Sequence, residues 1–188
     1  MASTIVETGR LRLREWDNAD EASFYAVMNT PAVMRHLGGV QTPDQWHAAY
    51  ERLRGYQRDF GFTFWIVERL GDGELQGFCG LKRVNYDGAP NPGECEIGWR
   101  LRESAWGQGI AKEAAIATLD LAFGRFAEPS AVALTFDANG SSWGLMERLG
   151  MTYDPALDFV DPRFPDDIVK QWRMTAADWP AARAVALA

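Results

Sequence analysis

Cysteine and histidine are scarce in this chain of 188 residues, which has two of each. Cys79 and Cys95 are 16 positions apart, and neither belongs to a Cys-x-x-Cys pattern, so the sequence predicts neither a disulfide framework nor a metal site. We expect both to be buried free thiols, because an unpaired cysteine behaves as a small apolar residue. His36 and His47 have no catalytic motif beside them, and we interpret them as surface or substrate-pocket residues.

Long apolar runs and a leader peptide are also missing. No run of 18 apolar residues occurs, and residues 1–14 lack a basic start followed by an apolar stretch. The sequence therefore predicts no membrane contact and no secretory signal, and a cytoplasmic location. Hydrophobic residues make up 47% and charged residues 24%, which is the balance of a globular protein. The length favours one domain over residues 1–188.

Basic residues are fewer than acidic ones: the chain has 19 Lys and Arg and 26 Asp and Glu, which gives a net charge of −7. An acidic surface repels phosphate backbones, so a nucleic-acid partner is disfavoured. A cationic small amine or a basic peptide is a more natural partner; alternatively, the acidity only keeps the protein in solution. The acids gather in two places: Asp17, Asp20 and Glu21, and then Asp154, Asp158, Asp161, Asp166 and Asp167.

The order of predicted elements indicates a fold with a mixed sheet. Alternating or β-branched segments predict strands, and apolar residues at helical spacing predict helices. The strands are expected at 10–14, 62–68, 75–84, 94–101, 131–137 and 168–174, with one more between 151 and 160; the helices are expected at 19–28, 43–59, 109–126 and 141–149, with a short helical piece before His36 and a helical or frayed tail. A tight turn at 71–73 makes the strands beside it antiparallel. The fold class is therefore α/β or α+β.

The segment from Glu94 to Ala114 carries the chemical signal. A strand ends near Leu101, and a short loop with Gly107 and Gly109 on either side of Gln108 leads into a helix. Glycines allow close backbone approach, and a helix start has unpaired N–H groups, so this loop suits an anion such as a diphosphate. It is not a P-loop, because no Gly-Lys-Ser/Thr is present. A dinucleotide fingerprint is incomplete, because Lys112 stands where its third glycine belongs.

The run Trp106-Gly107-Gln108-Gly109-Ile110-Ala111 resembles the coenzyme A loop of the GNAT N-acetyltransferases, Gln/Arg-x-x-Gly-x-Gly/Ala. The continuation through Ala114 looks like the Rim-type branch, the ribosomal-protein alanine N-acetyltransferases. Further stretches that match at family spacing are Leu11–Arg14, Glu96–Gly98, Asn139 with Ser142, and Glu147–Met151. The resemblance covers about Thr8 to Met174.

The resemblance implies a GNAT-like mixed, twisted sheet of about six to seven strands, splayed at its centre and flanked by helices, with acetyl-CoA as co-substrate. It implies that backbone N–H groups of Gly107, Gln108, Gly109, Ile110 and Ala111 bind the pyrophosphate, with Trp106 in the same loop. The main chain of Trp99 and Leu101 is expected to pair with the pantetheine arm. Asn139 and Ser142 are expected near that arm or the thioester.

Acetyl transfer to an amine requires a base for the amine and benefits from a proton donor for the departing thiolate. Glu96 is the leading base candidate, and we expect Glu94 on the same strand face to raise a carboxyl pKa by like-charge repulsion. The alternative is that Glu96 only forms a structural ion pair. Many family members carry a tyrosine acid where this chain has Met146, which has no proton to donate. Ser142 is the expected substitute, unless it only caps its helix, and Tyr153 is a second choice.

These observations favour an N-acetyltransferase that moves the acetyl group of acetyl-CoA to a primary amine by direct attack in a ternary complex. The acceptor class, a protein N-terminus or a small-molecule amine, stays open. The alternative is a non-catalytic coenzyme A-binding sensor or scaffold, and a dinucleotide-dependent enzyme is disfavoured by the topology. A monomer or homodimer is expected.

Overall fold

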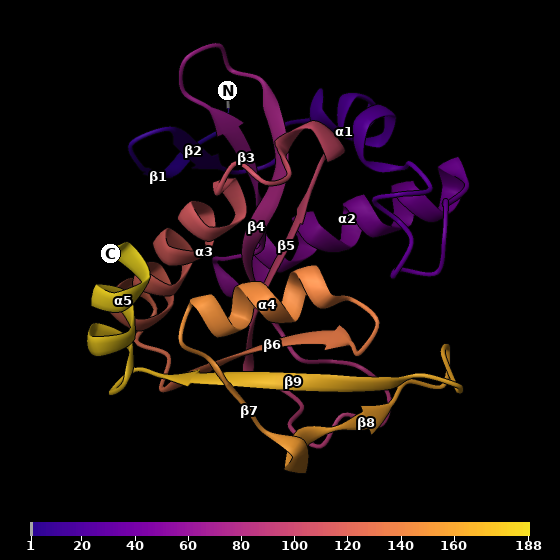
Figure 1. Ribbon diagram of the computed structural model, residues 1–188. Helices are drawn as coiled ribbons and strands as arrows, with labels where there is room; N and C mark the ends of the chain where they lie inside the picture. The colour runs from indigo at the N-terminus through magenta and orange to yellow at the C-terminus, as the bar shows by residue number, and fades with distance from the viewer. Residues whose placement is uncertain (1) are drawn as a thin grey trace. The chain divides into compact units, whose positions relative to one another are not determined.

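The structure is a computed structural model that describes residues 2–188 (Figure 1). The chain forms two compact units. The first unit runs to Leu81 and resumes over Trp99–Ala117, and the second comprises Lys82–Gly98 and Thr118–Ala188. The boundaries between the units fall within strands β4 (Leu75–Arg83) and β5 (Cys95–Leu101) and within helix α3 (Ile110–Asp120).

Antiparallel strands form the sheet of the first unit. Strand β1 (Thr4–Glu7) pairs with β2 (Leu11–Arg14), β2 pairs with β3 (Phe64–Arg69), and β3 pairs with β4. Helices α1 (Asp20–Met28) and α2 (Pro43–Phe60) lie on one side of β3–β5, and the start of α3 lies on the other (Figure 1). The side chains between the strands and α1–α2 form an apolar cluster of Phe24, Met28, Val33, Trp46, Ile66 and Phe78. This aromatic core fixes the helices to the sheet.

Local sequence signals account for the start and end of α2. The Thr42 side chain accepts a hydrogen bond from the Gln45 backbone N–H, and the Gln45 side chain accepts one from the Thr42 N–H. Such a capping box satisfies two N–H groups that the helix leaves unpaired. Gly61 ends the helix with a φ of 74°, a conformation that glycine adopts without steric cost. The prediction of this helix from its Thr-Pro-Asp-Gln start is confirmed.

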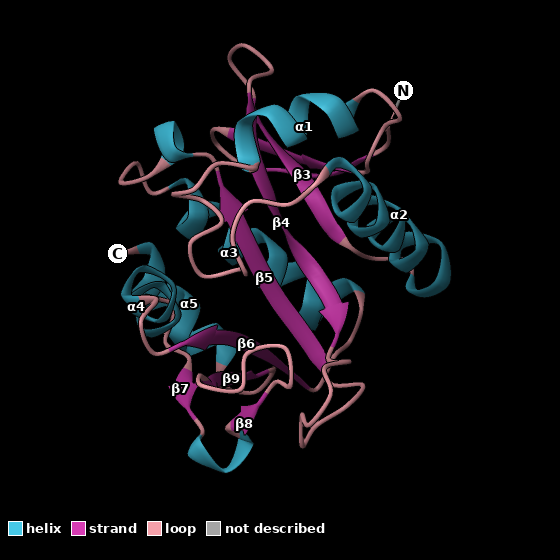
Figure 2. Cartoon of the chain, turned by 90° about the vertical axis from the view of Figure 1, so that its right-hand side faces the viewer, coloured by secondary structure: helices cyan, strands magenta, loops and turns pink. Residues whose placement is uncertain are grey.

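The second unit is built around the long strand β9 (Ile168–Thr175). Strand β6 (Ser130–Phe136) pairs with β9 along one edge, and the short strands β7 (Thr152–Tyr153) and β8 (Phe159–Val160) pair with its other edge (Figure 2). Strand β5 runs parallel to β6, with Glu96 opposite Val132. Helices α4 (Gly140–Arg148) and α5 (Trp179–Leu187) complete this unit, and a π-helical turn over Leu121–Arg125 extends α3.

The predicted fold class is confirmed, with nine strands instead of six to seven. The hydrogen-bonded order is β1-β2-β3-β4-β5-β6-β9-β7, and β8 also pairs with β9. The additional strands are β1 and a second two-residue strand in the segment 151–160. The short helical piece expected before His36 is wrong, because residues 31–38 form turns. The helical tail is confirmed as α5.

Both cysteines are buried free thiols, as the sequence predicts. Burial raises the pKa of Cys95 to about 12, so this thiol stays protonated and unreactive at neutral pH. No helix within residues 2–188 is long and apolar enough to cross a bilayer. Across the same residues, no group of three or more His, Cys, Asp or Glu side chains is arranged to hold a metal ion.

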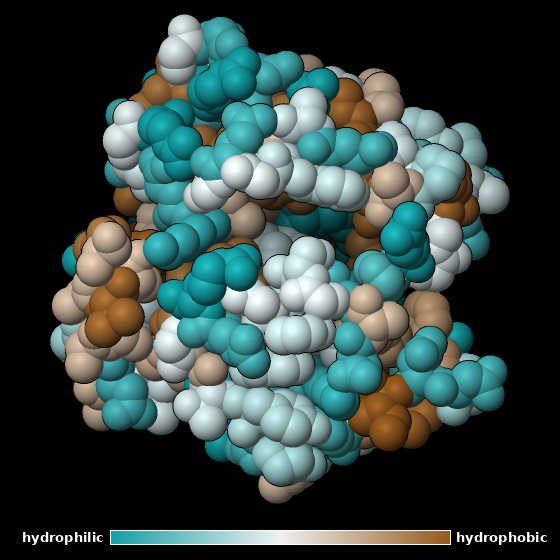
Figure 3. All heavy atoms as spheres, viewed as in Figure 1, coloured by the Kyte–Doolittle hydropathy of each residue, from teal (hydrophilic) through white to brown (hydrophobic). Residues whose placement is uncertain are grey.

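Apolar side chains are also exposed on the second unit. Val160 and Ile168 face each other across the β8–β9 pair and are 47% and 53% exposed. Figure 3 shows apolar surface at this end of β8 and β9 and over α5, where Val185 and Leu187 are exposed. Small exposed groups of this kind are common on folded proteins, and the oligomeric state stays a prediction.

Gly80 allows β3 and β4 to approach each other closely, and we expect Gly80→Ala to destabilise the protein by about 3 kcal/mol. An added Cβ would lie 2.1 Å from the Thr63 carbonyl oxygen and 2.7 Å from the Phe64 Cα, so the two backbones would have to separate. Urea unfolding measures the change. Gly71→Ala in the β3–β4 turn is the matched control, because nothing lies within 4 Å of its added Cβ. Equal unfolding midpoints for the two variants would contradict the expectation.

Candidate active site

A loop over residues 106–109 joins the end of β5 to α3 in the first unit, after a 3₁₀ turn at Glu103–Ala105. Gly107 and Gly109 have φ angles of 71° and 75°, a left-handed conformation that few residues besides glycine adopt. An added Cβ at Gly107 would meet nothing within 4 Å. The two glycines therefore turn the chain tightly and leave the backbone open to a ligand.

No backbone N–H group of residues 107–112 donates a close, well-aligned hydrogen bond to an acceptor within residues 2–188. The first N–H in this part of the chain with a helical partner belongs to Glu113, which donates to the Gly109 carbonyl. A row of unpaired N–H groups at a helix start attracts anions, and the helix dipole adds to the attraction. The loop thus fits the diphosphate of coenzyme A in its donors and in its open glycine face.

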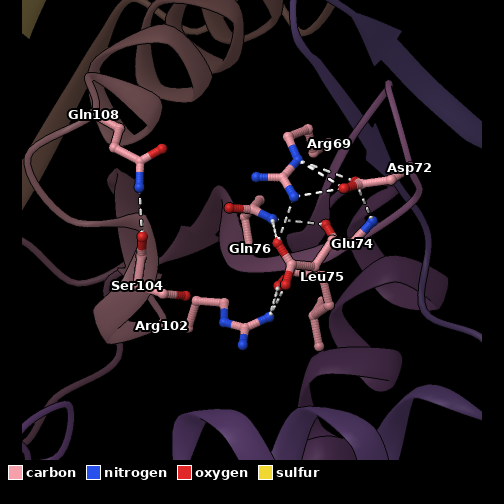
Figure 4. A network of polar contacts seen from close by, with 8 residues as sticks. All are labelled: Arg69, Asp72, Glu74, Leu75, Gln76, Arg102, Ser104 and Gln108. Atoms are coloured by element: carbon pink, nitrogen blue, oxygen red, sulfur yellow. Dashed lines mark hydrogen bonds and ion pairs between the residues drawn. The ribbon is translucent and has the colours of Figure 1, made fainter.

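Side chains of the loop bind it to the segment of chain just before it. The Trp106 indole is 50% exposed and donates from Nε1 to the Leu101 carbonyl oxygen over 2.9 Å. The Gln108 side chain bends back to the 3₁₀ turn, where Nε2 donates to the Ser104 carbonyl oxygen over 2.5 Å (Figure 4). The polar groups of these two side chains therefore bind the backbone that precedes the loop. The backbone N–H groups of the loop are the donors that could bind an anion.

A polar network fixes the chain just before the loop (Figure 4). Arg102 donates from Nη1 to Glu74 Oε1 over 2.9 Å, and its backbone N–H donates to the Gln76 carbonyl oxygen over 2.9 Å. Glu74 also accepts from Arg69 over 2.8 Å, and Arg69 pairs with Asp72. The Arg69 guanidinium holds the pKa of Asp72 at about 2, so the Arg69–Asp72 ion pair persists at neutral pH.

Glu96 lies in the second unit and is 5% exposed. Its Oε1 accepts a hydrogen bond from the Tyr86 hydroxyl over 3.0 Å, and Lys82 Nζ lies 3.3 Å from Oε2. Lys82 Nζ also lies 3.9 Å from the centre of the Tyr86 ring. Burial raises the pKa of Glu96 above its usual range, against the opposing effects of Lys82 and Tyr86. A carboxylate that holds its proton more tightly is better matched to accepting one near neutral pH.

The expected cause of the Glu96 shift is wrong. Like-charge repulsion from Glu94 was predicted, but burial is the cause. Glu94 pairs with Arg173 over 2.8 Å and accepts hydrogen bonds from Asn91 and Ser130. Burial alone would raise the pKa of Glu94, but these three partners lower it. The two carboxylates therefore differ in environment and in protonation behaviour.

Asn139 and Ser142 lie at the start of α4 in the second unit. Asn139 occupies the N-cap position without a side-chain capping bond, and its Oδ1 accepts from the Ser141 hydroxyl over 3.0 Å. The Ser142 hydroxyl makes no hydrogen bond within residues 2–188. Ser142 is therefore not the cap of this helix, and its hydroxyl is available to a ligand.

The remaining proton-donor candidates differ in access. Met146 is 1% exposed and packs in the core, where it has no proton to donate. Tyr153 is 38% exposed, and its hydroxyl donates to Asp158 Oδ2 over 2.5 Å. This bond raises the pKa of Tyr153 and commits its proton to the carboxylate. The Tyr153 hydroxyl is thus already engaged by a carboxylate, whereas the Ser142 hydroxyl has no partner within residues 2–188.

Many of the acids predicted to attract a cation are already paired. Asp20 is buried and forms a bidentate ion pair with Arg14, with both contacts at 2.7 Å. Asp161 is buried and pairs with Arg163. Glu21 accepts from His47, an exposed surface histidine whose pKa this bond raises. The acidic field at each cluster is consequently weaker than the sequence suggests.

The comparisons with known proteins agree with this geometry. Residues 10–152 match the family model described as "Acetyltransferase (GNAT) domain", and the chain belongs to this family. It is 30% identical over 157 residues to the uncharacterized protein YkkB of Bacillus subtilis (strain 168), which covers 83% of this chain and 90% of YkkB. The crystal structure of an acetyltransferase from Agrobacterium tumefaciens str. C58 aligns with a TM-score of 0.75 at 29% identity, over 88% of this chain and 92% of that one.

More distant structures share the fold. A spermidine N-acetyltransferase from Vibrio cholerae, solved with CoA and spermine, has a TM-score of 0.71 at 18% identity, and 92% of this chain and 99% of that chain are covered. The ribosomal L7/L12 N-acetyltransferase RimL has a TM-score of 0.72 at 15% identity, with 93% and 95% covered. The protein is therefore an acyltransferase of the GNAT family, whose members use acetyl-CoA and whose general reaction is acetyl transfer to an amine.

Several residues around the candidate site were not singled out by the sequence analysis. Lys82 and Tyr86 surround Glu96, and Thr8 and Arg10 contact the first turn of α3. Lys82 and Tyr86 precede Glu96 by 14 and 10 positions, and the β4–β5 turn brings them to it. The sequence carried one signal for the second group: Arg10 opens the alternating run that predicted a strand.

Proposed function

We propose that this protein transfers the acetyl group of acetyl-CoA to the primary amine of a protein N-terminus or a small molecule, by direct attack in a ternary complex. Bound acetyl-CoA supplies the thioester that the amine attacks. The observation that carries the proposal is the row of unpaired N–H groups over residues 107–112, which begins a helix behind two left-handed glycines. The proposal treats residues 1–188 as one working domain. The family match over 10–152 supports it, because the match includes segments of both units.

Different segments of the chain are assigned to different parts of acetyl-CoA. Gly107, Gln108, Gly109, Ile110 and Ala111 bind the pyrophosphate through their backbone, and the Trp106–Leu101 contact holds the loop. The main chain of Trp99 and Leu101 binds the pantetheine arm, and Asn139 with Ser142 binds near its thiol end. These assignments follow the family resemblance. The open face at Gly107 and the uncommitted Ser142 hydroxyl support them.

Glu96 is the proposed base. Its burial excludes direct contact with a bulky acceptor, so a water molecule carries the proton from the amine to the carboxylate. The raised pKa of Glu96 supports this role, because a base whose pKa approaches the working pH transfers protons efficiently.

Ser142 is the proposed proton donor to the departing thiolate, and Ser142→Ala is expected to lower kcat by about 100-fold. The acetyl-CoA affinity should change little, because the diphosphate loop stays intact. Steady-state kinetics and calorimetry measure the two quantities. Ser141→Ala is the matched control on the same turn, since its hydroxyl bonds Asn139 and is exposed. An unchanged kcat for Ser142→Ala would remove the role.

For the acceptor, the proposal names only its chemical class. A cationic amine is favoured by the net charge of −7, and the pairing of Asp20 and Asp161 limits that attraction to the unpaired acids. Assignment to the Rim-type branch is supported by the loop motif and by the shared fold with RimL at 15% identity. The spermidine acetyltransferase of the same fold supports a polyamine equally well.

A screen of amines tests the proposal. Release of free thiol from acetyl-CoA is measured with a panel of peptide N-termini, polyamines and aminoglycosides, and acetylated products are identified by mass spectrometry. Thiol release with one amine class supports the reaction and names the acceptor. Tight binding of acetyl-CoA without turnover across the panel would favour the coenzyme A-binding sensor or scaffold instead.

A further inference from the structure

Arg10 contacts the proposed diphosphate loop and the first turn of α3 at once. It lies just before β2, and its Nη1 donates to the Gln108 carbonyl oxygen over 3.1 Å. Its Nε and Nη2 both lie 2.6 Å from Glu113 Oε2. An added Cβ at Gly109 would lie 3.5 Å from Arg10 Nη2. The guanidinium therefore lies against the second glycine of the loop, and all of these residues belong to the first unit.

Glu113 explains why a cation is needed at this place. Its carboxylate lies in the first turn of α3, the same turn that holds the last of the unpaired N–H groups. Oε1 accepts from the Thr8 hydroxyl over 2.5 Å and from the Arg10 backbone N–H over 3.0 Å. Burial alone would raise the pKa of Glu113, but the bonds from Thr8 and Arg10 lower it. The carboxylate is consequently ionised at neutral pH, and its charge would repel a diphosphate.

We propose that Arg10 is a positioning residue for the acetyl-CoA diphosphate. It neutralises Glu113 and fixes the loop through the Gln108 carbonyl, so that the N–H groups of residues 107–112 face the ligand without a competing negative charge. The inference rests on the proposed function, because it requires that this loop binds the diphosphate.

Arg10→Gln tests the role by calorimetry with coenzyme A and by steady-state kinetics. We expect the Kd for coenzyme A and the KM for acetyl-CoA to rise about tenfold, because a charged hydrogen bond and a neutralising charge are lost. The kcat at saturating acetyl-CoA and the KM for the amine should stay within twofold. If Arg10 only stabilised the fold, its substitution would lower the melting temperature but would not raise the KM for acetyl-CoA while leaving kcat unchanged. Arg10→Lys should recover part of the affinity, since it keeps the charge but not the fork of donors.

Arg12→Gln is the matched control. Arg12 lies two positions further along β2, and its Nε pairs with Glu7 over 2.8 Å, with both side chains about half exposed. Arg12→Gln removes the same charge two positions along the chain, from a side chain whose ion pair with Glu7 does not involve the loop. Equal losses of coenzyme A affinity in the two variants would show a general charge effect and would overturn the inference.

The double variant Arg10→Gln with Glu113→Gln distinguishes the neutralisation of Glu113 by Arg10 from a disruption of the local structure. The single variant Glu113→Gln keeps the Arg10 cation and loses the repelling carboxylate, so it should bind coenzyme A at least as tightly as the unaltered protein. The double variant should bind more tightly than Arg10→Gln alone. If each single variant instead weakens coenzyme A binding and the two losses add in the double variant, the neutralising role is contradicted.

Failure of this inference and failure of the proposed function give different results. If Gly109→Glu abolishes coenzyme A binding while Arg10→Gln leaves it unchanged, the loop is the diphosphate site and Arg10 has no part in it. If neither variant changes the affinity, the loop assignment itself is wrong. Circular dichroism and thermal melting of each variant confirm that a folded protein is compared.

Discussion

Gly109→Glu is expected to weaken acetyl-CoA binding by at least about 100-fold, the largest effect on the cofactor that one substitution in this chain should give. The new carboxylate would stand at the start of α3, among the N–H groups proposed to bind the diphosphate, and like charges repel strongly at such distances. The φ of 75° at this position adds a strain of about 1 kcal/mol for any residue with a Cβ. Calorimetry measures the affinity, and circular dichroism checks the fold.

Two controls isolate the effect of the charge at the loop. Gly109→Ala introduces the same backbone strain without the charge, and we expect a small loss of affinity. Gly61→Glu introduces the same side chain at a glycine with a φ of 74° and nothing within 4 Å, at the C-terminal end of α2. If Gly61→Glu weakened binding as much as Gly109→Glu, the loss would not report on the loop.

Glu96→Gln is expected to lower kcat by about 10²–10⁴-fold, the usual contribution of a general base. The raised pKa of Glu96 also predicts the pH dependence. A base works only when deprotonated, so kcat should fall as the pH drops through the raised pKa, above the range of an ordinary glutamate. In Glu96→Gln this acidic limb should disappear, because no titrating carboxylate remains. The acetyl-CoA affinity should change little.

Glu94→Gln is the matched control for this experiment. Glu94 lies two positions earlier and has a lowered pKa from its bonds to Asn91, Ser130 and Arg173. Its loss should reduce stability, because Arg173 then keeps only its 3.5 Å contact with Asp154. The acidic limb should stay in place. A Glu96→Gln variant with full activity and an unchanged pH profile would show that the Lys82–Glu96–Tyr86 cluster is structural.

The strength of local signals explains what the sequence could predict. The capping box at Thr42 and the glycine loop before α3 act over a few residues, so both were visible in the sequence. Strands β7 and β8 have two residues each, and they exist because β9 offers an edge to pair with. Turns replace the helical piece expected before His36, where Gly38 and Gly39 both take positive φ angles. Short elements of this kind depend on tertiary partners rather than on propensity.

The glycine loop and the carboxylate on β5 could be picked out from the sequence, whereas the electrostatics around them could not. The spacing of Gly107 and Gly109 located the loop, and the strand position of Glu96 selected a carboxylate that is buried. The cause of its raised pKa required the structure, because repulsion by Glu94 is prevented by three bonds that involve residues up to 79 positions away. Arg10 and Glu113 are 103 positions apart, and no local pattern connects them.

The interleaving of the two compact units has a consequence for synthesis of the chain on the ribosome. The first unit needs residues 99–117 in addition to the segment that ends at Leu81. At about 5–20 residues per second, residue 117 is added roughly 2–7 s after residue 81. During that interval the nascent first unit lacks β5 beyond Gly98 and the first turns of α3. Neither unit is a continuous stretch of chain, so a fragment that ends at Leu81 is expected to be captured by chaperones or degraded rather than to fold independently.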